Sequence, residues 1–116
     1  MAINAAGIVM GAQGLFLLGN GVYLLAFPDR PASDPNGPFY NTPVSVIRAF
    51  STTSFSIGAF YLQAVYQRNR SVTALSVVGR AMAVGVFGFM CGEGAWRKVA
   101  AFEGAMGVLL ALSLFV

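Results

Sequence analysis

Four long apolar segments dominate the pattern of hydrophobic and polar positions along the chain. An α-helix rises about 1.5 Å per residue, so segments of about 20 residues match a bilayer core roughly 30 Å thick. The pattern therefore predicts an all-α fold, an integral membrane four-helix bundle that occupies residues 1–116 as a single domain. The predicted helices cover approximately Ala5–Phe27, Val44–Tyr66, Val72–Gly92 and Val99–Val116.

The connections between these segments differ in length and composition. The first, FPDRPASDPNGPFYNTP, contains all five prolines of the chain, and proline breaks a helix because it lacks an N–H. A loop this long is either a lid over a binding site or a plain surface connection. The other two, Gln67–Ser71 and Glu93–Lys98, are short. We therefore expect an up-down-up-down arrangement with both termini on the same side of the membrane.

The composition excludes several classes of function. Hydrophobic residues make up 57% of the chain and charged residues only 9%, against roughly 25% in a typical soluble domain. One cysteine, Cys91, and no histidine exclude an intrachain disulfide, a structural zinc site and a His-based catalytic triad. The net charge of +3 includes no long basic cluster, so no nucleic-acid partner is expected. The glycines form no dinucleotide fingerprint, and no cofactor is expected.

Polar side chains interrupt every apolar segment. Arg80 lies near the middle of the third segment, where a charge costs on the order of 3 kcal/mol on insertion scales. Polar positions on the second segment form one stripe when the helix is wound at about 100° per residue. Lipid cannot satisfy such groups, so we expect them to face the interior of the bundle. The stripe is Ser45, Arg48, Thr52, Ser56 and Gln63, and the other segments add Gln13, Asn20, Thr73, Ser76 and Glu103.

The depth of the charged residues suggests which of them pair. Arg48 and Glu103 each lie about five residues inside the end that carries the proline-rich loop, or roughly 7 Å, so we expect these two to form an ion pair. Arg80 lies roughly 12 Å from the opposite end, although its long side chain can reach toward Glu103. One glutamate cannot neutralise two arginines. The surplus charge indicates a polar cavity for an oxygen-rich or anionic ligand, the alternative being that these groups only hold the bundle together.

These residues limit the chemistry that such a cavity could perform. Glu103 is the candidate acid or base, and Glu93 could complete a carboxylate pair. Arg48 or Arg80 could orient a carboxylate or stabilise developing oxygen charge. Epoxide opening, acid-triggered cyclisation and isomerisation need only such groups. The expected substrate-binding side chains are Asn20, Tyr23, Tyr40, Thr52 and Ser56; as alternatives, Tyr23 belongs to an interfacial aromatic belt and Tyr40 is a loop residue at the membrane interface.

Small residues recur at four-residue spacing, a pattern that lets membrane helices approach closely. They could pack the bundle internally or form the interface of a homo-oligomer. The spaced pairs are Gly7 with Gly11, Ala81 with Gly85, and Gly88 with Gly92.

Several short motifs resemble those of a known group of proteins. They are FP at the end of the first segment, VIRAF in the second, GR in the third and FEGAMGVLLAL in the fourth. In these the chain is similar to small four-helix membrane proteins of the DoxX-like kind, especially fungal ones. It is also similar to the small integral-membrane cyclases and epoxide hydrolases of fungal polyketide and meroterpenoid pathways. The resemblance implies an enzyme for a lipophilic natural product, with Arg48, Arg80 and Glu103 as its polar centre.

We therefore expect a multi-pass membrane enzyme, in the endoplasmic reticulum if the source is eukaryotic, that opens an epoxide on a lipophilic substrate by hydrolysis or cyclisation. The larger terpene cyclases of such pathways usually have more helices than this chain can make, which favours epoxide chemistry. The alternatives are a non-catalytic accessory or scaffold subunit of a membrane complex, and a small lipid-binding or transport protein.

Overall fold

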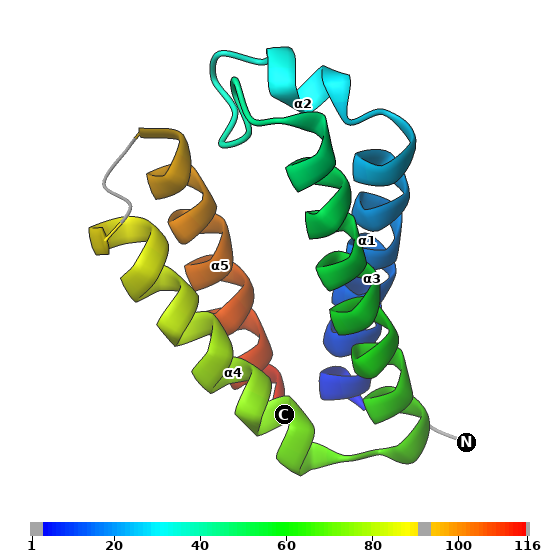
Figure 1. Cartoon of the computed structure of the whole chain (residues 1–116). Helices are drawn as coiled ribbons and strands as arrows, with labels where there is room; N and C mark the ends of the chain where they lie inside the picture. Colours follow the sequence, from blue (N-terminus) through cyan, green and yellow to red (C-terminus); the bar gives the residue numbers. More distant parts are fainter. Residues whose placement is uncertain (1–3, 91–93, 116) are drawn as a thin grey trace.

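The computed structural model describes residues 4–90 and 94–115, and in these ranges the protein is all-α with four main helices and no strand. Successive main helices run in opposite directions, and the start of α1 lies at the same end of the molecule as the end of α5 (Figure 1). The helices are α1 (Ala5–Ala26), the short α2 (Asp29–Ser33), α3 (Val44–Gln67), α4 (Arg70–Gly85) with the π-helical turn η1 (Val86–Met90), and α5 (Gly94–Ser113).

The sequence predicted the first three main helices to within a few residues and placed the start of the fourth too late. Helix α5 begins at Gly94, whereas the apolar pattern suggested Val99. The polar residues Trp96, Arg97 and Lys98, expected in a loop, form its first turns. The proline-rich loop also contains α2, because a proline at the start of a helix needs no N–H donor there.

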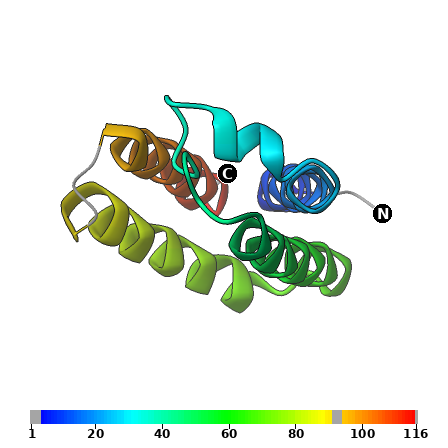
Figure 2. The same cartoon turned by 45° about the horizontal axis from the view of Figure 1, so that its top comes forward.

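The four main helices form two pairs, α1 with α3 and α4 with α5. The pairs lie beside each other when the molecule is viewed from the loop end (Figure 2). They approach closely at the end that carries the termini and diverge toward the proline-rich loop (Figure 1). Only Arg68 and Asn69 connect α3 to α4, and this tight turn holds the pairs together at their narrow end.

Glycine permits the close contact between α1 and α3. A Cβ atom added at Gly58 would lie 2.9 Å from the carbonyl oxygen of Gly14, and one added at Gly14 would lie 3.1 Å from the carbonyl oxygen of Gly58. The backbones of the two helices therefore touch at this crossing. Neither residue belongs to the spaced pairs singled out in the sequence; at Gly85, a member of one such pair, no atom lies within 4 Å of an added Cβ.

The polar stripe expected inside the bundle lies on the outside of α3. Ser45, Arg48, Thr52, Ser56 and Gln63 are all exposed. The prediction of an inward-facing stripe is therefore wrong. The buried face of α3 is instead the one that contains Gly58, because only there can α3 approach α1 backbone to backbone. Its members are Ile47, Ser51, Ser54, Gly58, Tyr61 and Ala64.

Hydrogen bonds to backbone oxygens satisfy the buried serines on this face. Ser51 donates to the carbonyl of Arg48 within its own helix at 2.5 Å, and Ser54 donates across to the carbonyl of Leu17 on α1 at 2.6 Å. A buried hydroxyl bonded in this way does not carry the penalty of an unpaired polar group. The buried serines of α3 are thus compatible with its packing against α1.

Within residues 4–90 and 94–115, two helices are long and apolar enough to cross a membrane, judged by length and composition. They are Ala5–Ala26 and the continuous stretch Arg70–Met90, which combines α4 and η1.

We predict that Gly58→Ala destabilises the protein by about 1–3 kcal/mol, because the new methyl group would force the backbones of α1 and α3 apart. Gly19→Ala on α1 is the matched control. No atom lies within 4 Å of a Cβ added there, and alanine favours helix, so its stability should stay the same or rise slightly. Chemical or thermal unfolding in detergent, followed by circular dichroism, measures both. Equal stability of the two variants would contradict the close crossing.

Candidate functional site

Arg80 lies at the point where all four main helices meet. Its side chain comes from α4 and is 6% exposed. One guanidinium nitrogen, Nη1, forms an ion pair with the Oε2 atom of Glu103 on α5. The other, Nη2, donates a 2.6 Å hydrogen bond to Oε1 of Gln13 on α1, and the guanidinium carbon lies 5.7 Å from the ring centre of Tyr61 on α3.

Gln13 extends this network across the gap between the two helix pairs. Its side-chain nitrogen donates a 3.2 Å hydrogen bond to the carbonyl oxygen of Met106 on α5, while its side-chain oxygen accepts from Arg80. Both ends of a buried amide are thus paired with groups from the opposite helix pair. The network therefore connects α1 to both α4 and α5 at one level.

The early start of α5 explains why Glu103 pairs with Arg80 and not with Arg48. Glu103 lies nine residues after Gly94, so it is roughly 14 Å along α5 instead of the expected 7 Å. Arg80 lies ten residues after Arg70, roughly 15 Å along α4 from the opposite end. The two side chains therefore lie at the same level. The predicted ion pair of Arg48 with Glu103 is wrong.

Gly107 allows α4 and α5 to approach each other at the ion pair. A Cβ atom added at Gly107 would lie 3.1 Å from the Cβ atom of Arg80. A larger residue there would push the backbone that carries Arg80 away from α5. The glycine-rich fourth segment thus positions the arginine as well as supplying its partner.

The Arg80 side chain keeps one donor unused. Its Nε atom is buried and has no hydrogen-bond partner among the described residues. Most buried donors in proteins are paired, so an unpaired one is an uncommon feature.

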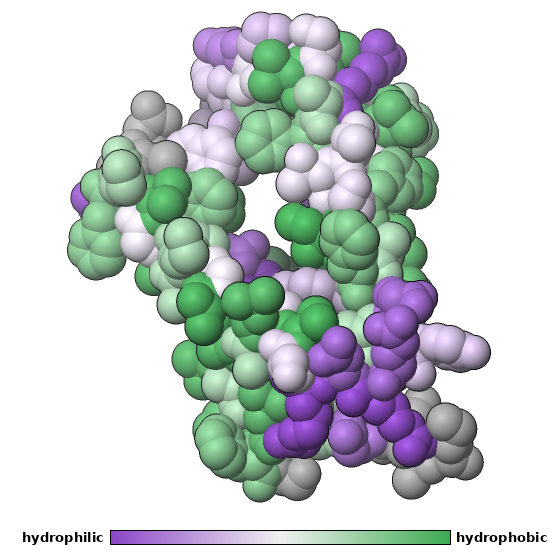
Figure 3. All heavy atoms as spheres, turned by 60° about the horizontal axis from the view of Figure 1, so that its bottom comes forward, coloured by the Kyte–Doolittle hydropathy of each residue, from purple (hydrophilic) through white to green (hydrophobic). Residues whose placement is uncertain are grey.

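Glu103 is partly accessible, in contrast to Arg80. Its side chain is 21% exposed. On α5 it lies between the face that contacts α4, which includes Gly107, and the face that contacts α1, which includes Met106 and Phe102. Its carboxylate therefore lies on the side of α5 that faces α4 and α1. The space-filling view shows an opening between the two helix pairs (Figure 3). Only Oε2 is engaged in the described part of the chain, so Oε1 is available to a ligand.

Aromatic side chains span the wide end of the molecule between the two pairs. Phe39 of the proline-rich loop packs edge-on against Phe50 of α3, with ring centres 5.3 Å apart, and against Trp96 of α5 at 6.1 Å. Trp96 stacks in turn on Phe87 of η1 at 5.0 Å. The loop therefore contacts both helix pairs at the end where they diverge.

Most of the other predicted site residues lie away from Arg80 and Glu103. Arg48 is exposed, and its Nε atom donates to the carbonyl of Leu25 at 3.4 Å. Thr52 and Ser56 are on the outer face of α3, and Tyr23 and Tyr40 are exposed. The structure therefore does not bring these residues together with Arg80 and Glu103.

Two further predictions concern Asn20 and Glu93. Asn20 donates a 3.3 Å hydrogen bond to Ser54, so it lies at the contact of α1 with α3. Glu93, like Cys91, lies outside the described residues.

Gln13 and Tyr61 complete the polar centre and were missing from the predicted site. Gln13 carried a signal, because it is a lone amide in an apolar helix that was expected to face inward. Tyr61 carried none, since a single tyrosine in an aromatic-rich helix does not reveal which face it occupies. No group of three or more potential metal-ligating side chains is found in residues 4–90 and 94–115.

Comparison with known proteins adds no relationship: no family model, no curated protein and no solved structure matches the chain.

We predict that Arg80→Met destabilises the protein by about 2–4 kcal/mol, because Glu103 and Gln13 then lose their charged partner while the side-chain volume is largely kept. Arg48→Met removes the same charge from an exposed position and should change stability by less than about 0.5 kcal/mol. Unfolding of both variants in the same detergent tests this. A larger loss for Arg48→Met would show that the described network is not the one that holds the bundle.

Proposed function

We propose that this protein is an integral membrane four-helix enzyme that opens an epoxide on a lipophilic substrate. In this proposal Glu103 activates the nucleophile, a water molecule or a hydroxyl group of the substrate itself. Arg80 is a positioning residue that holds the carboxylate. The observation that carries the proposal is a partly accessible carboxylate between apolar helices, fixed by a buried arginine through one oxygen, while its second oxygen has no partner among the described residues.

The exposure of the apolar helices supports the membrane location. In the most apolar window of Arg70–Met90, only 11% of residues are buried inside the protein. A core helix of a soluble protein would be mostly buried, and large exposed apolar surfaces are uncommon on soluble monomers. Large side chains along this helix, including Leu75, Val78 and Met82, are more than half exposed. A lipid environment would cover them.

The chemistry requires only groups that the site contains. Glu103 accepts a proton from water as the water oxygen forms a bond to an epoxide carbon and the carbon–oxygen bond breaks. The alkoxide that results takes up a proton from water, Glu103 gives its proton back to water, and the product is a diol; an internal hydroxyl would instead give a cyclic ether. Base catalysis of this kind contributes typically 10²–10⁴-fold in rate. The surrounding apolar helices would limit competing water.

The resemblance to fungal cyclases and epoxide hydrolases supports the same substrate class. The polar centre in the structure differs from the expected one in its arginines and its carboxylates. Arg48 lies outside it, and Glu103 is the one carboxylate that the described structure places there. The remaining centre therefore suits a mechanism with one carboxylate and one arginine.

A second candidate function is that of a non-catalytic subunit in a membrane complex, or of a small lipid-binding protein. The outer face of α3 favours the subunit. Ser45, Thr52, Ser56 and Gln63 are exposed there, and polar groups that face lipid are unfavourable unless another chain pairs with them. In this case the Arg80 network would serve only to join the helix pairs.

We predict that Glu103→Gln lowers epoxide turnover by about 10²–10⁴-fold, because an amide cannot accept the proton. The purified protein in lipid nanodiscs is incubated with a panel of lipophilic epoxides, and diols or cyclic ethers are measured by mass spectrometry. Thr52→Val, on the outer face of α3, is the control and should keep full activity.

Two outcomes of this experiment contradict the catalytic role. Turnover that survives in Glu103→Gln would remove Glu103 from the mechanism. Binding of the compounds without conversion, or co-purification of a stoichiometric protein partner that Thr52→Val disrupts, would favour the non-catalytic function.

A further inference from the structure

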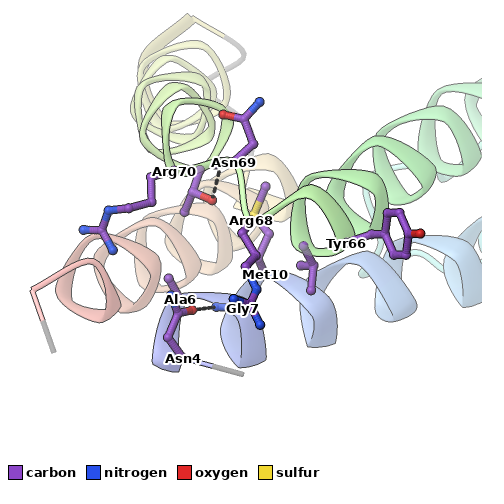
Figure 4. A pocket seen from close by; sticks show the side chains of 10 residues that line it. Asn4, Ala6, Gly7, Met10, Tyr66, Arg68, Asn69 and Arg70 are labelled. Atoms are coloured by element: carbon purple, nitrogen blue, oxygen red, sulfur yellow. Dashed lines mark hydrogen bonds between the residues drawn. The ribbon is translucent and has the colours of Figure 1, made fainter. Parts of the chain in front are cut away.

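A pocket of about 680 Å³ lies at the narrow end of the molecule, away from Glu103. The first turns of α1, the last turn of α3 and the start of α4 enclose it (Figure 4). Its floor is apolar and includes Met10, which is 1% exposed, and Val65. The polar part of its lining includes Arg68 and Arg70, which come from the turn between α3 and α4.

The two arginines extend in different directions from this turn. Arg68 points across toward the first turn of α1 near Gly7, whereas Arg70 extends toward the C-terminal part of α5 (Figure 4). Arg70 donates a 2.6 Å hydrogen bond to the carbonyl of Leu114, the one side-chain hydrogen bond that it forms with a described residue. Arg68 forms no ion pair or side-chain hydrogen bond with any described residue. Donors therefore flank the pocket on two sides.

The side-chain oxygens of the neighbouring asparagines are already engaged with their own helices. Asn4 accepts a 2.8 Å hydrogen bond from the backbone nitrogen of Gly7, and Asn69 accepts one from Val72 at 3.2 Å. Both act as helix caps. The arginines are the positively charged donors of the lining, and the start of the 22-residue helix α1 adds the positive end of a helix dipole.

Negative charge is absent from this end of the described structure. Asp29 and Asp34 lie in the proline-rich loop at the far end, and Glu103 is engaged by Arg80 in the middle. Hydrophilic side chains gather at the narrow end when it is turned toward the viewer (Figure 3). An uncompensated pair of arginines above an apolar floor is complementary to a ligand with an anionic head and an apolar tail.

We infer that this pocket binds an anionic phospholipid, with its phosphate at Arg68, Arg70 adding positive charge at the edge of the pocket, and the start of an acyl chain against Met10 and Val65. Arginine forms strong charge-assisted hydrogen bonds with phosphate. In a membrane, the narrow end would lie at headgroup level, where such a ligand is abundant. The inference shares only the membrane location with the proposed enzyme and does not depend on epoxide chemistry.

The test measures lipid binding to the purified full-length protein in detergent by native mass spectrometry. Phosphatidylglycerol should bind more tightly than phosphatidylcholine, which carries a phosphate but no net charge. Arg68→Gln should weaken phosphatidylglycerol binding by about five- to tenfold. Arg97→Gln removes the same charge from α5 at the other end of the molecule and should leave binding unchanged.

A second variant tests the pocket separately from net charge. Gly7→Leu places a side chain in the pocket lining and changes no charge, so it should also weaken phosphatidylglycerol binding. Circular dichroism confirms that each variant is folded. Equal losses in Arg68→Gln and Arg97→Gln would show a general charge effect, and unchanged binding in Gly7→Leu would exclude the pocket; either result overturns the inference. Inorganic phosphate that competes at millimolar concentration would assign the site to a free anion in place of a lipid.

Discussion

The buried guanidinium of Arg80 is the constraint on which the arrangement of the helices depends. A charge withdrawn from water needs a partner of opposite charge and hydrogen-bond acceptors within reach. Glu103 supplies the charge, Gln13 supplies an acceptor, and the ring of Tyr61 covers one face. These three residues come from three different helices. Satisfying one side chain therefore requires both helix pairs to be in place.

The two helix pairs are held together internally by different forces. Backbone contact at Gly14 and Gly58 joins α1 to α3, a contact made by van der Waals packing with no charge involved. An ion pair joins α4 to α5, where Gly107 provides the close approach. Electrostatic attraction strengthens as the surroundings become less polar, whereas packing contacts hardly respond. The pair that carries the candidate site is therefore the more sensitive to water that enters between the helices.

Much of the fold could be predicted from the sequence, because long apolar segments and a proline-rich break are strong local signals. The position of Arg80 near the middle of its helix, and its need for a buried partner, could also be predicted, since a charge in an apolar helix must be paired. Its actual partner could not be, because the start of α5 is set by whether Trp96, Arg97 and Lys98 join the helix. Because α5 begins five residues earlier than predicted, Glu103 lies roughly 7 Å further along the helix, at the level of Arg80 and not at that of Arg48. The buried face of α3 could not be predicted either. The polar stripe was the clearer pattern in the sequence, but the close contact of Gly58 with α1 buries a different face.

The two-residue connection between α3 and α4 fixes the position of Arg80 along the helix bundle. Because α3 ends at Gln67 and α4 begins at Arg70, the distance of Arg80 from that turn depends on the number of helical residues between them. The position of Gln13 depends instead on the number of residues that separate it from the start of α1. Adding or deleting one residue between Asn69 and Arg80 would move the guanidinium by about 1.5 Å along α4 and rotate it by about 100° around the axis. Substitutions in this part of α4 can therefore be absorbed, whereas a change in its length would direct the charge away from its partners.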